Sequence, residues 1–107
     1  MKIAIYQIDP RKDVNRLLFC NLDMVEQMTG SREIDGSIYD MVWFGEVDCE
    51  TLEDVYRMFN VNRPADFQGR SLSVSDVVEV FEQNGSSRFW FCDSIGFAEV
   101  ELRKTVG

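Results

Sequence analysis

Turn-forming residues recur at short intervals through the second half of the chain and limit the length of every element between them. These residues are Asn60, Pro64, Gly69, Asn84, Gly85, Asp93 and Gly96. An Asn-Gly pair readily adopts the positive φ angles of a tight hairpin. The β-type runs on either side of it, Val77–Glu82 and Arg88–Cys92, are therefore predicted to form a β-hairpin.

Three further strands are predicted from the pattern of apolar residues. Lys2–Ile8 is apolar on both alternating faces, as expected for a strand inside a sheet. Ile38–Val47 is aromatic and β-branched, and Gly45 within it suggests a bulge. In Phe97–Leu102 the small or apolar residues alternate with Glu99 and Glu101, which is typical of a half-exposed strand.

Two helices are predicted from capping residues and helical spacing. Asn21 can cap a short helix in which Leu22, Val25 and Met28 share one face, and Gly30 can end it. Arg16–Cys20 before it fits either a short strand or the beginning of that helix.

The second helix begins after Thr51, which is a suitable cap, and has Glu53 and Asp54 at its positive dipole end. Its apolar stripe, predicted to pack on a sheet, consists of Leu52, Val55, Tyr56 and Phe59. Asn60 and then Pro64 are expected to end it.

These elements predict one compact α+β domain over residues 1–107. About five strands would form a mainly antiparallel or mixed sheet, with the two helices packed on one face. The proportion of hydrophobic residues, 45%, suffices for a single core.

The composition argues against several classes of function. No apolar run exceeds four residues, so neither a membrane span nor a secretory signal is expected, and the cytoplasm is the predicted location. The chain has no histidine and three widely spaced cysteines, which are expected to be free thiols. We therefore expect no cofactor, no metal and no enzymatic activity.

The negative charge is concentrated in the middle of the chain. Eight of the 19 acidic residues lie between Glu33 and Tyr56, where there is no Lys or Arg, and the 11 basic residues balance the others. Such a chain should repel nucleic acid and favour a protein partner with a basic surface. The candidate binding surface consists of Glu46, Asp48, Glu50, Glu53 and Asp54.

Two other interpretations of these acids are open. They could form a solvated loop and helix start that only promote solubility. Alternatively, carboxylates spread along an elongated surface could imitate the phosphates of a duplex and occupy a DNA-binding cleft.

A second candidate site is polar. If Arg70–Asp76 were extended, the hydroxyls of Ser71, Ser73 and Ser75 would share one face beside Arg70 and Asp76, and could hold a peptide or small anion. Asp93 could approach Asp76 and form a carboxylate pair. The alternative, which we favour, is that these side chains bond to nearby backbone in turns.

The aromatic run Phe89–Phe91 also has two interpretations. Aromatic strands stack bases in some single-strand binders. Here only Arg88 flanks the run directly, so packing in the core on both faces of a strand is favoured.

Several of these segments together resemble the YodL-like domain, a family of Gram-positive bacterial proteins. The resemblance rests on the Tyr6 strand, Leu52–Asn60 (LEDVYRMFN), Pro64–Val78 (PADFQGRSLSVSDVV), the Asn84-Gly85 turn and Asp93–Phe97 (DSIGF). It implies a single-domain protein of the kind often encoded on mobile genetic elements beside antirestriction-type domains, and it supplies no catalytic motif.

The leading hypothesis is therefore a non-enzymatic, acidic protein-interaction module, serving as an accessory or host-modulating factor of a mobile element. The alternatives are a DNA-mimic inhibitor of a nuclease or restriction enzyme, and a small-ligand binder or enzyme that uses Arg70, Ser73, Asp76 and Asp93.

Overall fold

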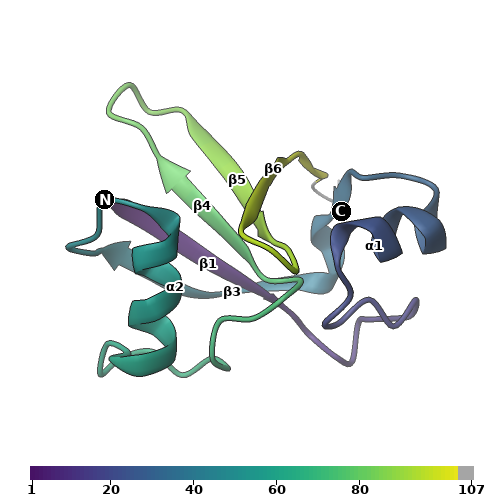
Figure 1. The fold of residues 1–107 in the computed structure, drawn as a ribbon, viewed down its shortest axis with the longest axis horizontal. Helices are drawn as coiled ribbons and strands as arrows, with labels where there is room; N and C mark the ends of the chain where they lie inside the picture. Colours follow the sequence, from purple (N-terminus) through teal and green to yellow (C-terminus); the bar gives the residue numbers. More distant parts are fainter. Residues whose placement is uncertain (104–107) are drawn as a thin grey trace.

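A computed structural model describes residues 1–103 and shows an α+β fold built on one antiparallel sheet of five strands (Figure 1). The strand order is β3-β1-β4-β5-β6, so β1, β4 and β5 lie inside the sheet. The strands are β1 (Lys2–Ile8), β3 (Tyr39–Glu46), β4 (Val77–Phe81), β5 (Ser87–Cys92) and β6 (Phe97–Val100). The predicted fold class is confirmed; the last four residues of the expected domain lie outside the described residues.

The end of the chain differs from the single strand predicted over Phe97–Leu102. The structure divides it into β6 and a short β7 (Leu102–Arg103), which pairs in parallel with β2 (Ile34–Asp35). The Glu101 carbonyl accepts a 2.8 Å hydrogen bond from the Ile34 amide, so the chain changes partners at this residue. A short 3₁₀ helix, η1 (Gly36–Ile38), then leads from β2 into β3.

Two hydrophobic clusters lie on opposite faces of the sheet. Neighbouring β4 residues show this directly, because Val78 belongs to one cluster and Val77 to the other. Helix α2 (Leu52–Val61) covers the Val78 face through Val55 and Phe59.

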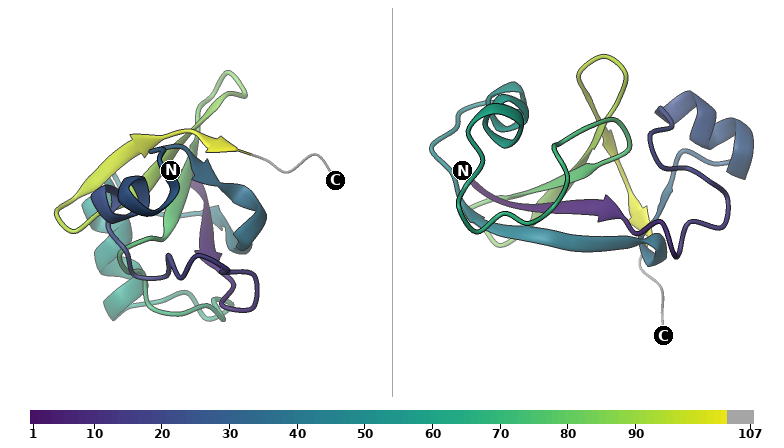
Figure 2. Two further views of the ribbon diagram at one scale, coloured as in Figure 1. Left: turned by 90° about the vertical axis from the view of Figure 1, so that its right-hand side faces the viewer. Right: turned by 90° about the horizontal axis from the view of Figure 1, so that it is seen from below.

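Helix α1 (Leu22–Thr29) packs on the Val77 face through Leu22 and Val25. The expectation that both helices pack on one face is therefore wrong. Because the sheet is strongly twisted, β6 stands between the two helices in the right-hand view of Figure 2.

Strand β3 is irregular at a position other than the predicted one. Ile5 pairs with Trp43 and Tyr6 with Met41, so Val42 is the extra residue of the bulge. Gly45 pairs regularly with Ile3, and the Trp43 indole lies over it. A Cβ at position 45 would be 2.7 Å from the indole Cη2, which explains the glycine.

The start of α1 is stabilised as its sequence predicts. The Asn21 side chain accepts a 2.9 Å hydrogen bond from the Met24 amide, and Gly30 ends the helix with φ +80°. Met28, however, is 55% exposed and does not belong to the packed face.

The segment Arg16–Cys20 is neither strand nor helix. The Asp13 carboxylate accepts hydrogen bonds from the Leu17 and Leu18 amides, at 2.8 and 2.9 Å. Arg16 and Phe19 adopt positive φ angles of 55° and 68°. A side-chain hydrogen bond therefore sets the conformation of this segment, which hydrophobic periodicity does not reveal.

Local signals predict α2 and the hairpin well. Thr51 and Asp54 form a reciprocal capping box, and the helix continues one residue beyond Asn60 to Val61. In the turn between β4 and β5, Gly85 has φ +89° and the Glu82 amide donates to the Ser86 carbonyl. Among the described residues, no helix has the length and apolar character needed to cross a bilayer.

Candidate functional site

Most of the acids between Glu33 and Tyr56 are paired with cations from elsewhere in the fold. Arg103 lies near Glu33 and Asp35, and Lys12 lies 2.8 Å from Asp40. The amino terminus lies 3.5 Å from Glu46, and Arg57 lies 3.5 Å from Asp54. These four cationic groups offset half of the eight negative charges of the acidic segment.

Three of the eight acids differ from the others. Within residues 1–103, no cationic group lies within ion-pair distance of Asp48, Glu50 or Glu53, and all three are exposed. They lie in the connection before α2 and in its first turn. We call these three residues the acidic corner; it is smaller than the surface of five residues that the sequence predicts.

Asp54, by contrast, stabilises the start of the helix. Its carboxylate accepts hydrogen bonds from the Glu50 and Thr51 amides, which lower the pKa of Asp54 below its usual value. Asp54 therefore fixes the backbone that carries the acidic corner.

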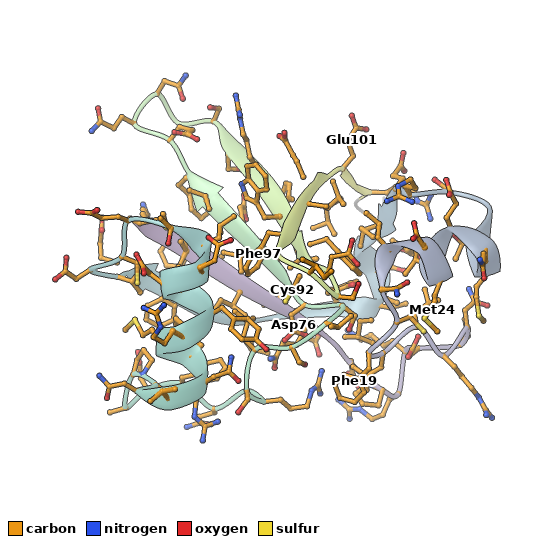
Figure 3. The ribbon with its side chains drawn as sticks, viewed as in Figure 1. Phe19, Met24, Asp76, Cys92, Phe97 and Glu101 are labelled. Atoms are coloured by element: carbon orange, nitrogen blue, oxygen red, sulfur yellow. The ribbon has the colours of Figure 1, made fainter. Side chains whose placement is uncertain are left out.

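A groove lies beside the acidic corner, between α2 and the turn that joins β5 to β6. Its volume is about 560 Å³. From α2 it is lined by Glu53, Tyr56, Arg57, Asn60 and Val61, and from the rest of the chain by Val74, Cys92, Asp93, Ser94, Gly96 and Phe97. In Figure 3, Cys92 and Phe97 lie between α2 and α1, beside β5 and β6.

Exposed apolar side chains surround this groove. Val61 is 80% exposed at the last turn of α2, and Tyr56 is 42% exposed one turn before it. Ile95, at the tip of the β5–β6 turn, is 93% exposed. The sequence predicts that Tyr56 packs on the sheet, but its ring is partly exposed at the groove.

The thiol in the groove wall is not activated. Cys92 is buried, and burial raises its pKa to about 12, with further contributions from Asp76 and Asp93. Because only a thiolate is strongly nucleophilic, this group is poorly suited to covalent catalysis near neutral pH. All three cysteines are free, as expected.

The predicted polar residues are divided among different environments. Arg70 and Asp76 meet through a residue that the sequence analysis did not select, Gln7. The Gln7 amide donates to the Asp76 carboxylate at 3.0 Å and to the Arg70 carbonyl at 2.9 Å, and its oxygen accepts from the Arg70 amide. The sequence signal for this role of Gln7 is that it is a polar residue at a buried position of β1, whose other buried residues are apolar.

Asp76 is completely buried, and burial raises its pKa to about 6. The Ser73 amide and the Gln7 side chain donate to one carboxylate oxygen, while the other oxygen has no protein partner within the described residues. The nearby guanidinium of Arg70 donates to the Ile8 carbonyl. This arrangement holds the loop before β4 against β1.

The three serines do not share one face, because the segment is not extended. Ser71 is exposed, Ser73 is half-buried, and Ser75 is buried with φ +83°. The Ser75 hydroxyl accepts a hydrogen bond from the Phe19 amide, and its carbonyl accepts one from the buried Tyr39 hydroxyl. Ser75 therefore connects three segments of the backbone.

Asp93 and Asp76 do not form a carboxylate pair that shares a hydrogen-bond partner. Asp93 accepts hydrogen bonds from the Leu22 amide at the start of α1 and from the Ser94 amide. Its own amide donates to the Gly96 carbonyl, which closes the turn. Among residues 1–103, no three Cys, Asp or Glu side chains are arranged to hold a metal ion.

The aromatic run of β5 contributes to the core on the α1 face. Phe91 is completely buried there, and Phe89 packs against the same cluster. Trp90 faces the other side of the sheet and is half-buried.

Comparison with known proteins agrees with the resemblance seen in the sequence. The model of the YodL-like domain matches residues 2–102, nearly the whole chain. The protein therefore belongs to the YodL-like domain family. No curated protein and no solved structure matches it.

Proposed function

We propose that the protein is a non-enzymatic interaction module that binds a basic surface of a partner protein through the acidic corner. The observation that carries this proposal is the contrast among the eight acids of the middle segment. Five have a cationic neighbour within the fold, whereas Asp48, Glu50 and Glu53 have none among the described residues. These three carboxylates can pair with cations from another molecule without breaking an internal ion pair.

Electrostatics gives such a corner two roles in association. Complementary charge accelerates encounter and favours the correct partner, and the effect weakens as salt screens the charges. The net charge of −8 adds a long-range attraction to basic proteins. Salt-sensitive binding is therefore expected.

The family context suggests where such a partner would be found. A factor carried on a mobile element would act on proteins of its host, and we place this interaction in the cytoplasm. In this role the protein modulates a host component without changing it chemically.

Affinity capture from host lysate at low and high salt tests the proposal. We expect one or more partners to bind the parent protein in a salt-sensitive way. Asp48→Lys/Glu50→Lys should lose them, whereas Glu82→Lys/Glu101→Lys, with the same change in net charge, should retain them. Equal retention by both double variants would contradict binding through the acidic corner.

The DNA-mimic alternative depends on the same region and has its own test. Mimicry requires regularly spaced charge over an elongated surface, and the pairing of Glu46 and Asp54 with cations leaves a compact corner instead. Charge reversal at Glu46, Asp48, Glu50, Glu53 and Asp54 should abolish inhibition in a nuclease assay if mimicry operates through this segment. We favour the interaction module because the acids that are unpaired among the described residues form a compact corner and not an elongated surface.

The small-ligand alternative required Arg70, Ser73, Asp76 and Asp93 to converge. Arg70 and Asp93 line different hollows of the surface, and Asp76 lines neither and is completely buried. These residues support the scaffold, so we do not propose a ligand site there.

A further inference from the structure

We propose that the groove between α2 and the β5–β6 turn receives the apolar side chains of a linear peptide segment from the partner, and that Glu53 binds a Lys or Arg of the same segment. This inference rests on the proposed function and specifies the chemistry of its partner. The groove and the acidic corner are continuous, because Glu53 belongs to both.

The groove offers an apolar bed that the fold itself does not cover. Phe97 packs with its ring against the α2-side cluster and forms part of the wall. Tyr56 and Val61 line the α2 side and are 42% and 80% exposed. A contiguous patch of exposed apolar side chains is typical of an interaction surface, because burying such side chains on binding is favourable.

Hydrogen bonds fix each of the two walls of the groove in place. On the α2 side, the side-chain amide of Asn60 donates to the Tyr56 carbonyl and to the Leu72 carbonyl, which ties the helix to the following loop. On the other side, the Asp93 carboxylate accepts from the Leu22 amide and thereby fixes the β5–β6 turn to α1. Because the walls are already ordered in the free protein, little conformational entropy of the protein is lost when a peptide binds in the groove.

The charges at the groove select the kind of peptide. Arg57 lies on the wall, but Asp54 lies 3.5 Å from its guanidinium and partly neutralises it. Glu53 is the exposed acid of α2 that lines the groove, whereas Asp48 and Glu50 line a neighbouring hollow that shares Arg57 and Val61 with it. A peptide segment with a basic residue beside apolar residues is complementary to this site, because its cation can pair with Glu53 while its apolar side chains occupy the groove.

A second copy of the chain fits the groove less well than a basic partner. Each copy carries a net charge of −8, so two acidic corners brought together would repel. We therefore assign the groove to a different protein that presents an extended or loop segment.

Selection from a phage-displayed library of random linear peptides on the immobilised protein tests this inference. We expect enriched peptides to combine two apolar residues with a nearby Lys or Arg. The enriched peptides are then synthesised, and their affinities for purified variants are measured by fluorescence anisotropy at low and high salt.

Two substitutions separate the groove from the charge, each with a matched control. Val61→Asn should weaken peptide binding about tenfold at both salt concentrations, because a contact is lost. Val14→Asn, at a residue that is 84% exposed and lines a different hollow, should have no effect. Glu53→Gln should weaken binding several-fold at low salt and less at high salt, whereas Glu82→Gln should not.

The outcomes distinguish the two proposals. If Glu53→Gln weakens binding and Val61→Asn does not, the groove is not the binding site and the inference fails, while the interaction module stands. Failure to enrich any peptide would also overturn the inference. If both substitutions are without effect on an enriched peptide, the groove and the acidic corner are both contradicted for that ligand.

Discussion

The Gln7 side chain donates a 3.0 Å hydrogen bond to the buried carboxylate of Asp76, although 69 positions separate the two residues. The same amide group pairs with both backbone polar groups of Arg70. One side chain of β1 therefore anchors both ends of the Arg70–Asp76 segment.

Replacement of this anchor should destabilise the fold. Gln7→Leu removes three hydrogen bonds and leaves buried polar groups unsatisfied, so we expect a loss of about 3 kcal/mol in the free energy of unfolding. Urea denaturation measures this loss. Gln83→Leu, in the exposed β4–β5 turn, serves as the control and should change stability by less than about 0.5 kcal/mol; equal losses would contradict the anchoring role.

Asp76 should make the fold less stable as the pH rises from about 4 to 6. The pKa of its carboxyl is raised from 3.8 to about 6, so in this interval the folded state binds the proton more tightly than the unfolded state. The folded state therefore loses up to ~3 kcal/mol of relative stability across the interval, with no further loss above it.

Asp76→Asn, which cannot ionise, should remove this dependence. Carboxyls with lowered pKa values, such as Asp35 and Asp54, act below the interval and in the opposite direction. Unfolding free energies of the parent and the variant, measured at pH 4, 5, 6 and 7, give the two slopes. An identical slope in both proteins would show that Asp76 does not titrate in this range.

Much of this structure is predictable because it depends on neighbours in the sequence. The caps at Asn21 and Thr51 and the Asn84-Gly85 turn depend on residues a few positions away. Both caps form as predicted, and the hairpin forms around Asn84-Gly85, although only Gly85 of the pair has a positive φ. The positions of the five strands of the main sheet follow from the same short-range patterns, whereas β2 and β7 do not.

Other features depend on contacts between distant residues. The choice of sheet face by α1 depends on the Asp9–Asn21 connection, whose path Asp13 sets with its side chain. The neutralisation of Glu33 requires Arg103, and that of Asp40 requires Lys12. The predicted acidic surface is therefore too large because pairing in space cannot be read from position in the chain.

Gly45 should be difficult to replace even with alanine. A Cβ would lie 2.7 Å from the Trp43 indole, so Gly45→Ala should displace the ring and destabilise the fold by about 1–3 kcal/mol. The displacement would also weaken the bond from the indole N–H to Asp66. In a Trp43→Phe background the penalty should shrink, because the phenyl ring lacks the contacting atoms; an unchanged penalty in this double-mutant cycle would exclude the contact as the cause.

Arg16 should tolerate glycine better than a branched residue. Its φ of 55° lies in the left-handed region, which is unfavourable for most side chains and worst for β-branched ones. We expect Arg16→Gly to leave stability within about 1 kcal/mol of the parent and Arg16→Val to lower it by about 1–2 kcal/mol. Thermal melts of the two variants provide the comparison, and equal melting temperatures would contradict a left-handed conformation at this position.

The most direct test of the interaction account is photo-crosslinking in the native host. A photo-reactive amino acid replaces either Ser94, which lines the groove, or Ser86, which is exposed in the β4–β5 turn. We predict that the Ser94 position yields a discrete crosslinked protein that Asp48→Lys/Glu50→Lys abolishes, while the Ser86 position does not yield it. Crosslinks that form equally from both positions, or that persist in the charge-reversed variant, would contradict binding at the groove and the acidic corner.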